Sequence, residues 1–362
     1  MTRLIEILIS LAIVAVLFLG VGLVLPSHRH LNEQVETNRK LTIVYDTLNS
    51  FRRFRDWNPL VLRDPRMKIQ LSGPESGVGA TLSYSSDHPQ LGDGSYKITA
   101  SEPGQSVTYA IDNSQRGGDK RTRFLFKPTG HAGRNIQITQ TYDVDYGWDL
   151  LGRYAGLYVR SHVGEDMKLG LQRLSNMLAT VPNADYRAQG TRLTDLKVVD
   201  RPAEDLLVVN AGAIARDPDK LKAAMNSDME WIKRSIEASG LTAAGPMRIV
   251  STEFGTQNYT FDVAVPVRRG SGDEAAAAAP DAQLTGLKLQ GPVKYVHNPA
   301  VRAASGSFTG YMMELENAHN MLRAWALTNG YEVVDRPYEV YKNGVEGAFS
   351  EDGQFEMYWN VK

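Results

Sequence analysis

The chain has 362 residues, of which 42% are hydrophobic, and its formal net charge is −1. The length predicts about two domains, and the near-neutral charge lacks the basic surface that nucleic-acid binding requires, so no nucleic-acid partner is expected. The absence of cysteine excludes disulfides, thiolate nucleophiles and cysteine-ligated metals. The seven histidines show no metal-site spacing, so we expect no metal and no other cofactor.

The N-terminus carries an uninterrupted apolar stretch, residues 7–25, in which Ser10 is the only polar side chain. As a helix this stretch spans about 28 Å, close to the thickness of the hydrocarbon core of a bilayer. A cleaved signal peptide has a shorter apolar core, about 7–15 residues, followed by a small-x-small cleavage site. The sequence shows neither feature and therefore predicts an uncleaved single-pass anchor, with residues 1–30 forming the anchor and a linker.

The charges that flank the apolar stretch leave the side of the membrane open. Arg29, Arg39 and Lys40 outnumber Arg3, which favours a cytoplasmic location for the soluble part. A short N-terminal tail before a single anchor more often stays inside, which favours export. We expect a single-pass protein of a bacterial inner membrane, with its soluble domains on the exported side.

Residues 31–183 predict a first domain made of a short helix, an antiparallel sheet and a closing helix. Residues 41–48 are the short helix candidate. The closing helix is predicted by an apolar stripe at helical spacing from Met167 to Val181, which Pro182 ends. Strands with one buried face are predicted by alternating apolar positions in residues 69–71, 80–84, 96–100, 107–111, 124–126 and 136–144.

Three motifs and the closing helix resemble the SRPBCC (START-like, helix-grip) superfamily, and within it the polyketide cyclase/dehydrase-like branch. The motifs are Asp56-Trp57-Asn58-Pro59, Asp64-Pro65 and Gly77-Val78-Gly79. The resemblance implies a sheet that curls around the long helix and an apolar cavity for a hydrophobic ligand. The alternative is that the aromatic residues of this domain only fill its core. The candidate cavity residues are Trp57, Tyr84, Tyr96, Tyr109 and Tyr142.

A polar linker at residues 184–194 is followed by a second domain, residues 195–362, with a weak internal repeat. Each copy reads strand, helix, proline-bearing turn and strand. The first copy runs from residues 206–209 through a helix at 220–238 to a strand at 261–267, and the second from 303–308 through 312–327 to 355–361. Between the copies, the low-complexity residues 270–281 predict a floppy loop or a short exposed helix.

The second domain is similar to the gyrase-inhibitory-protein-like domain, the effector-binding module of AraC-type and MerR-type activators. The similarity rests on Gly245-Pro246, Tyr338-Glu339-Val340-Tyr341 and Phe355-Glu356-Met357-Tyr358, whereas Trp359-Asn360-Val361 departs from the usual ending. It implies duplicated β-α-β-β units around a groove that binds amphipathic, often cationic, aromatic molecules against a buried acid, here Glu356. The alternative is that Glu356 lies on a solvated strand face. The candidate groove residues are Asp262, Tyr338, Tyr341, Glu356 and Tyr358.

The predicted fold class is therefore α+β, and three functions remain open. The first is a membrane-tethered binder of hydrophobic or amphipathic small molecules with no catalytic residue, because no nucleophile–base pair is recognisable. The second is an enzyme, either a cyclase or aromatase in the first domain or a hydrolase using Glu356 with Tyr341 or Tyr358. The third is a ligand-sensing regulatory adaptor, which lacks a DNA-binding helix-turn-helix. An all-apolar cavity favours the binder, and converging titratable groups favour the enzyme.

Overall fold

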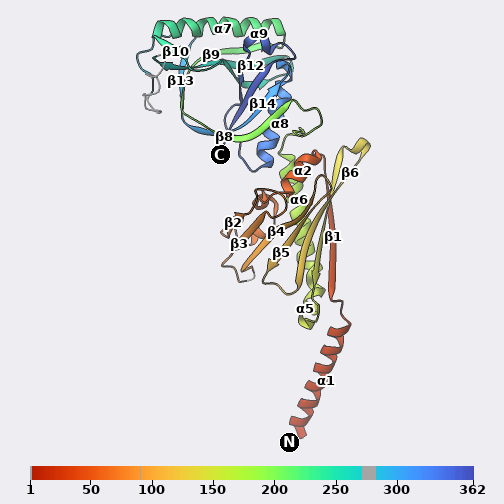
Figure 1. The fold of residues 1–362 in the computed structure, drawn as a ribbon. Helices are drawn as coiled ribbons and strands as arrows, with labels where there is room; N and C mark the ends of the chain where they lie inside the picture. The colour runs from red at the N-terminus through yellow and green to blue at the C-terminus, as the bar shows by residue number, and fades with distance from the viewer. Residues whose placement is uncertain (1, 90, 271–282) are drawn as a thin grey trace. The chain divides into compact units, whose positions relative to one another are not determined.

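A computed structural model describes residues 2–89, 91–270 and 283–362 of the chain. The chain divides into two compact units, Met1–Asn183 and Ala184–Lys362, which we call unit 1 and unit 2. Each unit is built on one antiparallel sheet (Figure 1). The predicted α+β class, with an apolar N-terminal helix and two antiparallel sheets, is confirmed. The predicted loop at residues 270–281 lies outside the described residues from position 271 onward.

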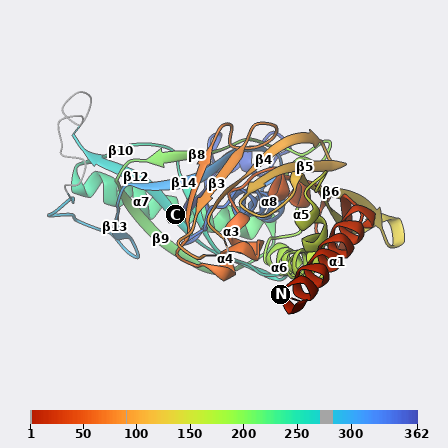
Figure 2. The same cartoon turned by 90° about the horizontal axis from the view of Figure 1, so that it is seen from below.

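Unit 1 is a seven-stranded antiparallel sheet with strand order β1-β7-β6-β5-β4-β3-β2. In the view of Figure 2, strands β3 to β6 lie on one side and α3, α4 and α6 on the other. The elements are α1 (Thr2–Val24), β1 (His28–Thr37), α2 (Leu41–Leu48), α3 (Phe54–Trp57), α4 (Leu60–Arg63), β2 (Lys68–Ser72), β3 (Thr81–Ser85), β4 (Asp93–Glu102), β5 (Ser106–Asn113), β6 (Gly118–Thr129), β7 (Asn135–Asp145), α5 (Leu150–Ala155) and α6 (Glu165–Ala179).

Helix α6 is held against the sheet by the apolar stripe that the sequence shows. Met167, Leu171, Leu174 and Leu178 recur at helical spacing and are all buried. Met167 packs in one cluster with the buried side chains of Tyr142 and Val144 on β7. Because a fully buried aliphatic side chain stabilises by about 1.5–3 kcal/mol, the buried stripe of α6 contributes to the stability of unit 1.

The first strand of the sheet corrects the predicted linker. β1 pairs with β7 along its whole length, from His28 opposite Asp145 to Thr37 opposite Ile136. Residues 28–30 therefore belong to the sheet and not to a juxtamembrane linker. The sequence does not predict this strand, because β1 lies at the sheet edge and lacks alternating apolar residues. Exposed and half-buried residues alternate along it.

In unit 2 the described residues form a nine-stranded antiparallel sheet, in which the main strand order is β13-β9-β12-β11-β15-β16-β14-β8 and β10 pairs with β12. Helix α7 packs on β9 and β12, and α8 packs on β14, β8 and β16. The elements are β8 (Leu193–Arg201), β9 (Glu204–Ala215), α7 (Pro218–Ser239), β10 (Leu241–Ala243), β11 (Arg248–Phe254), β12 (Asn258–Arg269), β13 (Lys294–Asn298), β14 (Val301–Thr309), α8 (Leu315–Thr328), β15 (Tyr338–Tyr341), α9 (Gly344–Ala348) and β16 (Gln354–Val361).

The connection between β8 and β9 shows that this sheet is strongly curled. Six strand-to-strand steps separate β9 from β8 in the sheet order, which in a flat sheet is about 29 Å. Only Pro202 and Ala203 lie between the two strands, and so short a segment reaches at most about 11 Å. The sheet must therefore bend until its two edges approach each other, and residues Arg201 to Glu204 cross its inner face.

The segment predicted as a polar linker, residues 184–194, is only partly exposed. Ala184 and Tyr186 are buried, and β8 already begins at Leu193. The polar composition of the segment does not predict this burial, because the three buried side chains, Ala184, Tyr186 and Leu193, are interspersed with exposed or half-buried ones.

Candidate functional site

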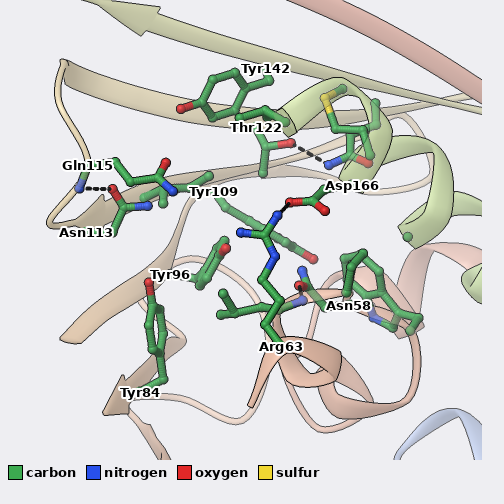
Figure 3. Close-up of a pocket in the computed structure, with 18 of the residues that line it drawn as sticks. Asn58, Arg63, Tyr84, Tyr96, Tyr109, Asn113, Gln115, Thr122, Tyr142 and Asp166 are labelled. Atoms are coloured by element: carbon green, nitrogen blue, oxygen red, sulfur yellow. Dashed lines mark hydrogen bonds and ion pairs between the residues drawn. The ribbon is translucent and has the colours of Figure 1, made fainter. Parts of the chain in front are cut away.

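A cavity of about 110 Å³ lies in unit 1 between the sheet and the helices α3, α4 and α6 (Figure 3). Its walls come from strands β3 to β7 on one side and from α6 and the segment Trp57–Arg63 on the other. All five residues predicted for this cavity line it, namely Trp57, Tyr84, Tyr96, Tyr109 and Tyr142. The structure thus brings together side chains that are far apart in the sequence. Trp57 and Tyr142, which lie on opposite walls, are 85 positions apart.

Two of the five aromatic side chains, those of Trp57 and Tyr109, are held in place in the cavity wall by contacts within the protein. The Trp57 ring packs edge-to-face on Phe54 and Phe124, with ring centroids 5.7 and 5.8 Å apart. The Tyr109 hydroxyl donates a hydrogen bond to the Leu48 carbonyl and so is not available to a ligand. Trp57 Nε1 is buried without a hydrogen-bond partner. These two residues define the shape of the cavity, and the indole N–H of Trp57 is the donor that they leave without a partner.

The segment that carries Trp57 is held in place by α6. Arg173 donates hydrogen bonds to the carbonyls of Asp56 (2.9 Å) and Trp57 (3.3 Å). Gly170 faces Pro59 so closely that an added Cβ would lie 3.1 Å from the proline ring. A larger residue at position 170 would push α6 away from this segment, so the glycine sets the width of the cavity.

Polar groups converge on the cavity from the sheet. Gln140 Nε2 donates to the Thr122 hydroxyl at 3.1 Å, and that hydroxyl donates to the Thr141 carbonyl at 2.8 Å. Gln140 Oε1 is buried and has no hydrogen-bond partner. Burial raises the pKa of both Tyr96 and Tyr142 well above the ordinary tyrosine value. The two hydroxyls are therefore neutral near pH 7 and act as hydrogen-bond donors rather than bases.

An ion pair stands at one side of the cavity. Arg63, at the end of α4, and Asp166, in the first turn of α6, are 2.5 Å apart and both partly exposed (Figure 3). The cavity is therefore not all apolar, and two titratable groups do converge on it. They neutralise each other, however, so neither is a free general base. Sequence reasoning missed this pair because the two residues are 103 positions apart.

Unit 2 carries two hollows, of about 470 and 570 Å³, on the inner face of its curled sheet. The candidate groove residues divide between them: Glu356 and Tyr358 line the first hollow, and Tyr338 and Asp262 line the second. Tyr341 is not in the groove, because strand alternation turns it to the other face, where its buried ring packs edge-to-face on Phe355 at 5.0 Å.

Glu356 is not the buried acid of this unit. Its side chain is 39% exposed and accepts hydrogen bonds from Lys342 (2.7 Å) and the Tyr358 hydroxyl (3.0 Å). The Lys342 bond is the main cause that lowers the pKa of Glu356. Two other carboxylates are buried: Asp262, which is 7% exposed and lines the second hollow, and Glu339, which is 0% exposed and 3.1 Å from His319 Nε2. Glu339 lies on the α8 side of the sheet, where it also accepts a hydrogen bond from the Tyr259 hydroxyl at 3.3 Å.

Four exposed apolar side chains, which we call the collar, lie in and next to α5, the helix that contacts α1. Its four members, Trp148, Leu151, Leu157 and Tyr158, are all exposed, Trp148 by 83% and Tyr158 by 64%. Helix α5, which carries Leu151, is attached to α1 by two neighbouring residues. The Tyr154 ring stacks on Phe18, with ring centroids 4.5 Å apart, and Arg153 donates hydrogen bonds to the carbonyls of Gly22, Leu23 and Leu25. Exposed apolar patches of this kind mark interaction surfaces.

No family model and no curated protein matches the chain. Solved structures with a similar fold include the C-terminal domain of EcmrR, which is 17% identical, with 46% of this chain and 97% of that chain covered and a TM-score of 0.36. Another is norcoclaurine synthase from Thalictrum flavum in complex with dopamine and hydroxybenzaldehyde, at 12% identity, 44% and 91% coverage and a TM-score of 0.33. A third is protein CV1439 from Chromobacterium violaceum, at 11% identity, 41% and 96% coverage and a TM-score of 0.30.

Proposed function

We propose that the protein is a membrane-tethered, non-catalytic binder of small hydrophobic or amphipathic molecules, and that the cavity of unit 1 holds the ligand. The observation that carries this proposal is the composition of that cavity. Six aromatic side chains line it together with seven polar or charged ones, which come from the sheet, from the segment after α3 and from α6. A concave pocket that combines aromatic walls with placed polar groups is the usual form of a site for a small amphipathic molecule.

The volume and the polar groups indicate the kind of ligand. An apolar cavity of about 150 Å³ in another protein holds benzene, so a cavity of about 110 Å³ suits a single ring or a short chain. Gln140 Oε1 lacks a donor, and a buried acceptor without a partner costs about 1–3 kcal/mol. A ligand hydroxyl or amine that donates to this oxygen would remove that cost.

Binding is favoured over catalysis by the state of the titratable groups. Arg63 and Asp166 are paired with each other, and burial keeps Tyr96 and Tyr142 protonated. A general base needs a free acceptor within hydrogen-bond reach of the proton that it removes. Among the residues described around the cavity, we find no side chain in that position.

The tether is supported by α1 together with the collar. Helix α1 is long and apolar enough to cross a bilayer, and in the tethered protein the collar residues Trp148 and Tyr158 lie beside the end of that helix. Tryptophan and tyrosine are enriched where a protein passes from lipid into water. Exposed aromatic residues beside the end of the helix are expected in an anchored protein, because they can lie at the membrane surface. If the helix were cleaved off, these residues would be exposed to water.

We further infer that unit 2 is a duplicated unit. Its elements repeat as β9-α7-β11-β12 and β14-α8-β15-β16. In the sheet order, β9-β12-β11 on one side mirrors β14-β16-β15 on the other, and β13 and β8 occupy the two edges. An order that reads the same from both ends is expected for two copies related by a pseudo-twofold axis between β11 and β15.

Filling the cavity tests the proposed function. Ile111→Trp enlarges a side chain that lines it, and overpacking of this kind costs about 1–3 kcal/mol. We expect the affinity for 4-ethylphenol, a single ring with a hydroxyl donor, to fall at least about tenfold. The measurement is calorimetry on the full chain in lipid nanodiscs, with empty nanodiscs subtracted.

The matched control is Asp112→Trp, which places the same side chain on the exposed face of the same strand. It should leave the affinity unchanged. If both variants bind 4-ethylphenol as the parent does, or if the parent does not bind it at all, the cavity is not a ligand site of the proposed kind.

A further inference from the structure

The two hollows of unit 2 meet at one cluster of charged side chains, Arg201, Glu204 and Arg248, which we call the arginine cluster. All three residues line both hollows. Arg201 ends β8 and Glu204 begins β9, so the short connection between these strands places both side chains near β16, β15 and β11. Arg248 is the first residue of β11. The cluster is therefore fixed by the topology and not by a flexible loop.

One carboxylate in this cluster serves two guanidinium groups. Glu204 Oε1 is 2.6 Å from Arg201 Nη2, and Glu204 Oε2 is 2.7 Å from Arg248 Nη1. Arg248 is only 3% exposed, and the side chains of Arg201 and Glu204 are mostly buried. These three side chains together carry an excess of positive charge in a poorly solvated place, which an anion would stabilise. Glu356 also acts on Arg201, but its carboxylate is held by Lys342.

The tyrosines beneath the cluster do not supply the missing negative charge. The Arg201 guanidinium lies 4.7 Å above the Tyr358 ring and that of Arg248 lies 5.0 Å above the Tyr338 ring. The two rings stack on each other at 5.0 Å. Burial raises the pKa of Tyr338, and burial followed by the hydrogen bond to Glu356 raises that of Tyr358 to about 12. Both rings are neutral near pH 7.

The aromatic faces that would attract a cationic ligand are therefore already covered by the protein's own arginines. The carboxylates around them also have partners. Glu356 is bound by Lys342, Asp262 is paired with Arg336 at 2.7 Å, and Asp205 accepts hydrogen bonds from Tyr295 (2.6 Å) and His297 (2.8 Å). A cation that entered the groove would have to displace one of these partners.

We propose that the arginine cluster binds the carboxylate of an amphipathic monoanion, whose apolar part lies in the larger hollow. This hollow of about 570 Å³ is lined by Leu206, Val208, Val250 and Val296 beside the cluster. Arg201 Nε and Arg248 Nε are both buried without a hydrogen-bond partner, and guanidinium N–H donors suit a carboxylate. The site belongs to unit 2, so it stands apart from the cavity proposed for unit 1.

Three probes with the same ring system and different charge test the site: 2-naphthoate, 2-naphthol and 2-naphthylmethylammonium. The probes are tested on the full chain with Ile111→Trp, in which the cavity of unit 1 is filled. The result for unit 2 then does not depend on whether the cavity of unit 1 is a ligand site. We expect naphthoate to bind about ten- to a hundredfold more tightly than naphthol, the range for hydrogen bonds to a charged group, and the ammonium probe to bind weakest. Equal or stronger binding of the ammonium probe overturns the proposal.

Substitutions in the cluster give the second arm of the test. Glu204→Gln keeps the shape but removes the competing carboxylate, so naphthoate affinity should rise about tenfold, whereas Arg248→Met should reduce it by a similar factor. Lys233→Met makes the same charge change on α7, away from both hollows, and should have little effect. If Glu204→Gln folds normally and does not strengthen naphthoate binding, or if Lys233→Met weakens it as much as Arg248→Met, the cluster is not the anion site.

Discussion

Deleting residues 1–25 should move the protein from the membrane fraction to the soluble fraction while both units stay folded. The deleted segment contains the whole apolar stretch and ends before β1, which begins at His28. Ser27 is kept because its carbonyl accepts a hydrogen bond from the Tyr146 amide at 2.7 Å. A helix of this length in lipid is effectively irreversibly inserted, so the expected change in partition is complete. Carbonate extraction followed by centrifugation measures it, and continued pelleting of the truncated chain would show a second mode of attachment.

The collar predicts a residual, reversible affinity of the truncated chain for vesicles. Removing α1 also removes the Phe18 ring from Tyr154 and leaves Trp148 and Tyr158 exposed. Trp148→Ser combined with Tyr158→Ser should abolish flotation of the truncated chain with lipid vesicles. Leu71→Ser combined with Val78→Ser removes two exposed apolar residues elsewhere on unit 1 and should not change it. Identical flotation of the two double variants would mean that the collar does not touch lipid.

How much of the fold the sequence predicts depends on whether one face of each element is buried. The strands of unit 1 from β2 to β7 and the helix α6 were predicted because apolar residues alternate or recur along them. β1 was missed because an edge strand can expose both faces. β2 to β7 pair in chain order, as expected for an antiparallel sheet of consecutive strands. Their register and the place of β1 beside β7 were not predictable, because the sequence of one strand does not specify its alignment with another.

The candidate sites show a sharper limit. The five aromatic residues of the cavity stood out by type, but Arg63 and Asp166 did not, because a charged residue at a helix end is ordinarily solvated. In Tyr338-Glu339-Val340-Tyr341, each face of the strand carries one tyrosine, so the pattern does not say which face α8 covers. The packing of that helix, a tertiary property, buries Glu339 rather than Glu356.

His319→Leu should be the most destabilising single substitution considered, because it removes the polar side chain that faces the buried carboxyl group of Glu339. The His319 side chain is 5% exposed, and its Nε2 lies 3.1 Å from Glu339 Oε2. Leaving a buried polar group without its partner costs about 1–3 kcal/mol, and more where the group is charged. The measurement is urea unfolding of the full chain, with hydrogen exchange of peptides from α8 and β15 reporting on unit 2.

A double-mutant cycle separates the effect of the unpartnered carboxyl group from lost packing. If the carboxyl group is the cause, combining His319→Leu with Glu339→Leu should restore much of the free energy of unfolding, since replacing both polar partners by apolar groups is often close to neutral. Tyr259 keeps its hydrogen bond to Ser251 at 2.7 Å in that variant. Glu356→Gln provides the matched comparison, because its half-exposed pair with Lys342 is worth at most about 1 kcal/mol. A double variant no more stable than His319→Leu alone would assign the loss to packing around the histidine, where Phe254 lies 5.2 Å from its ring, and not to the buried acid.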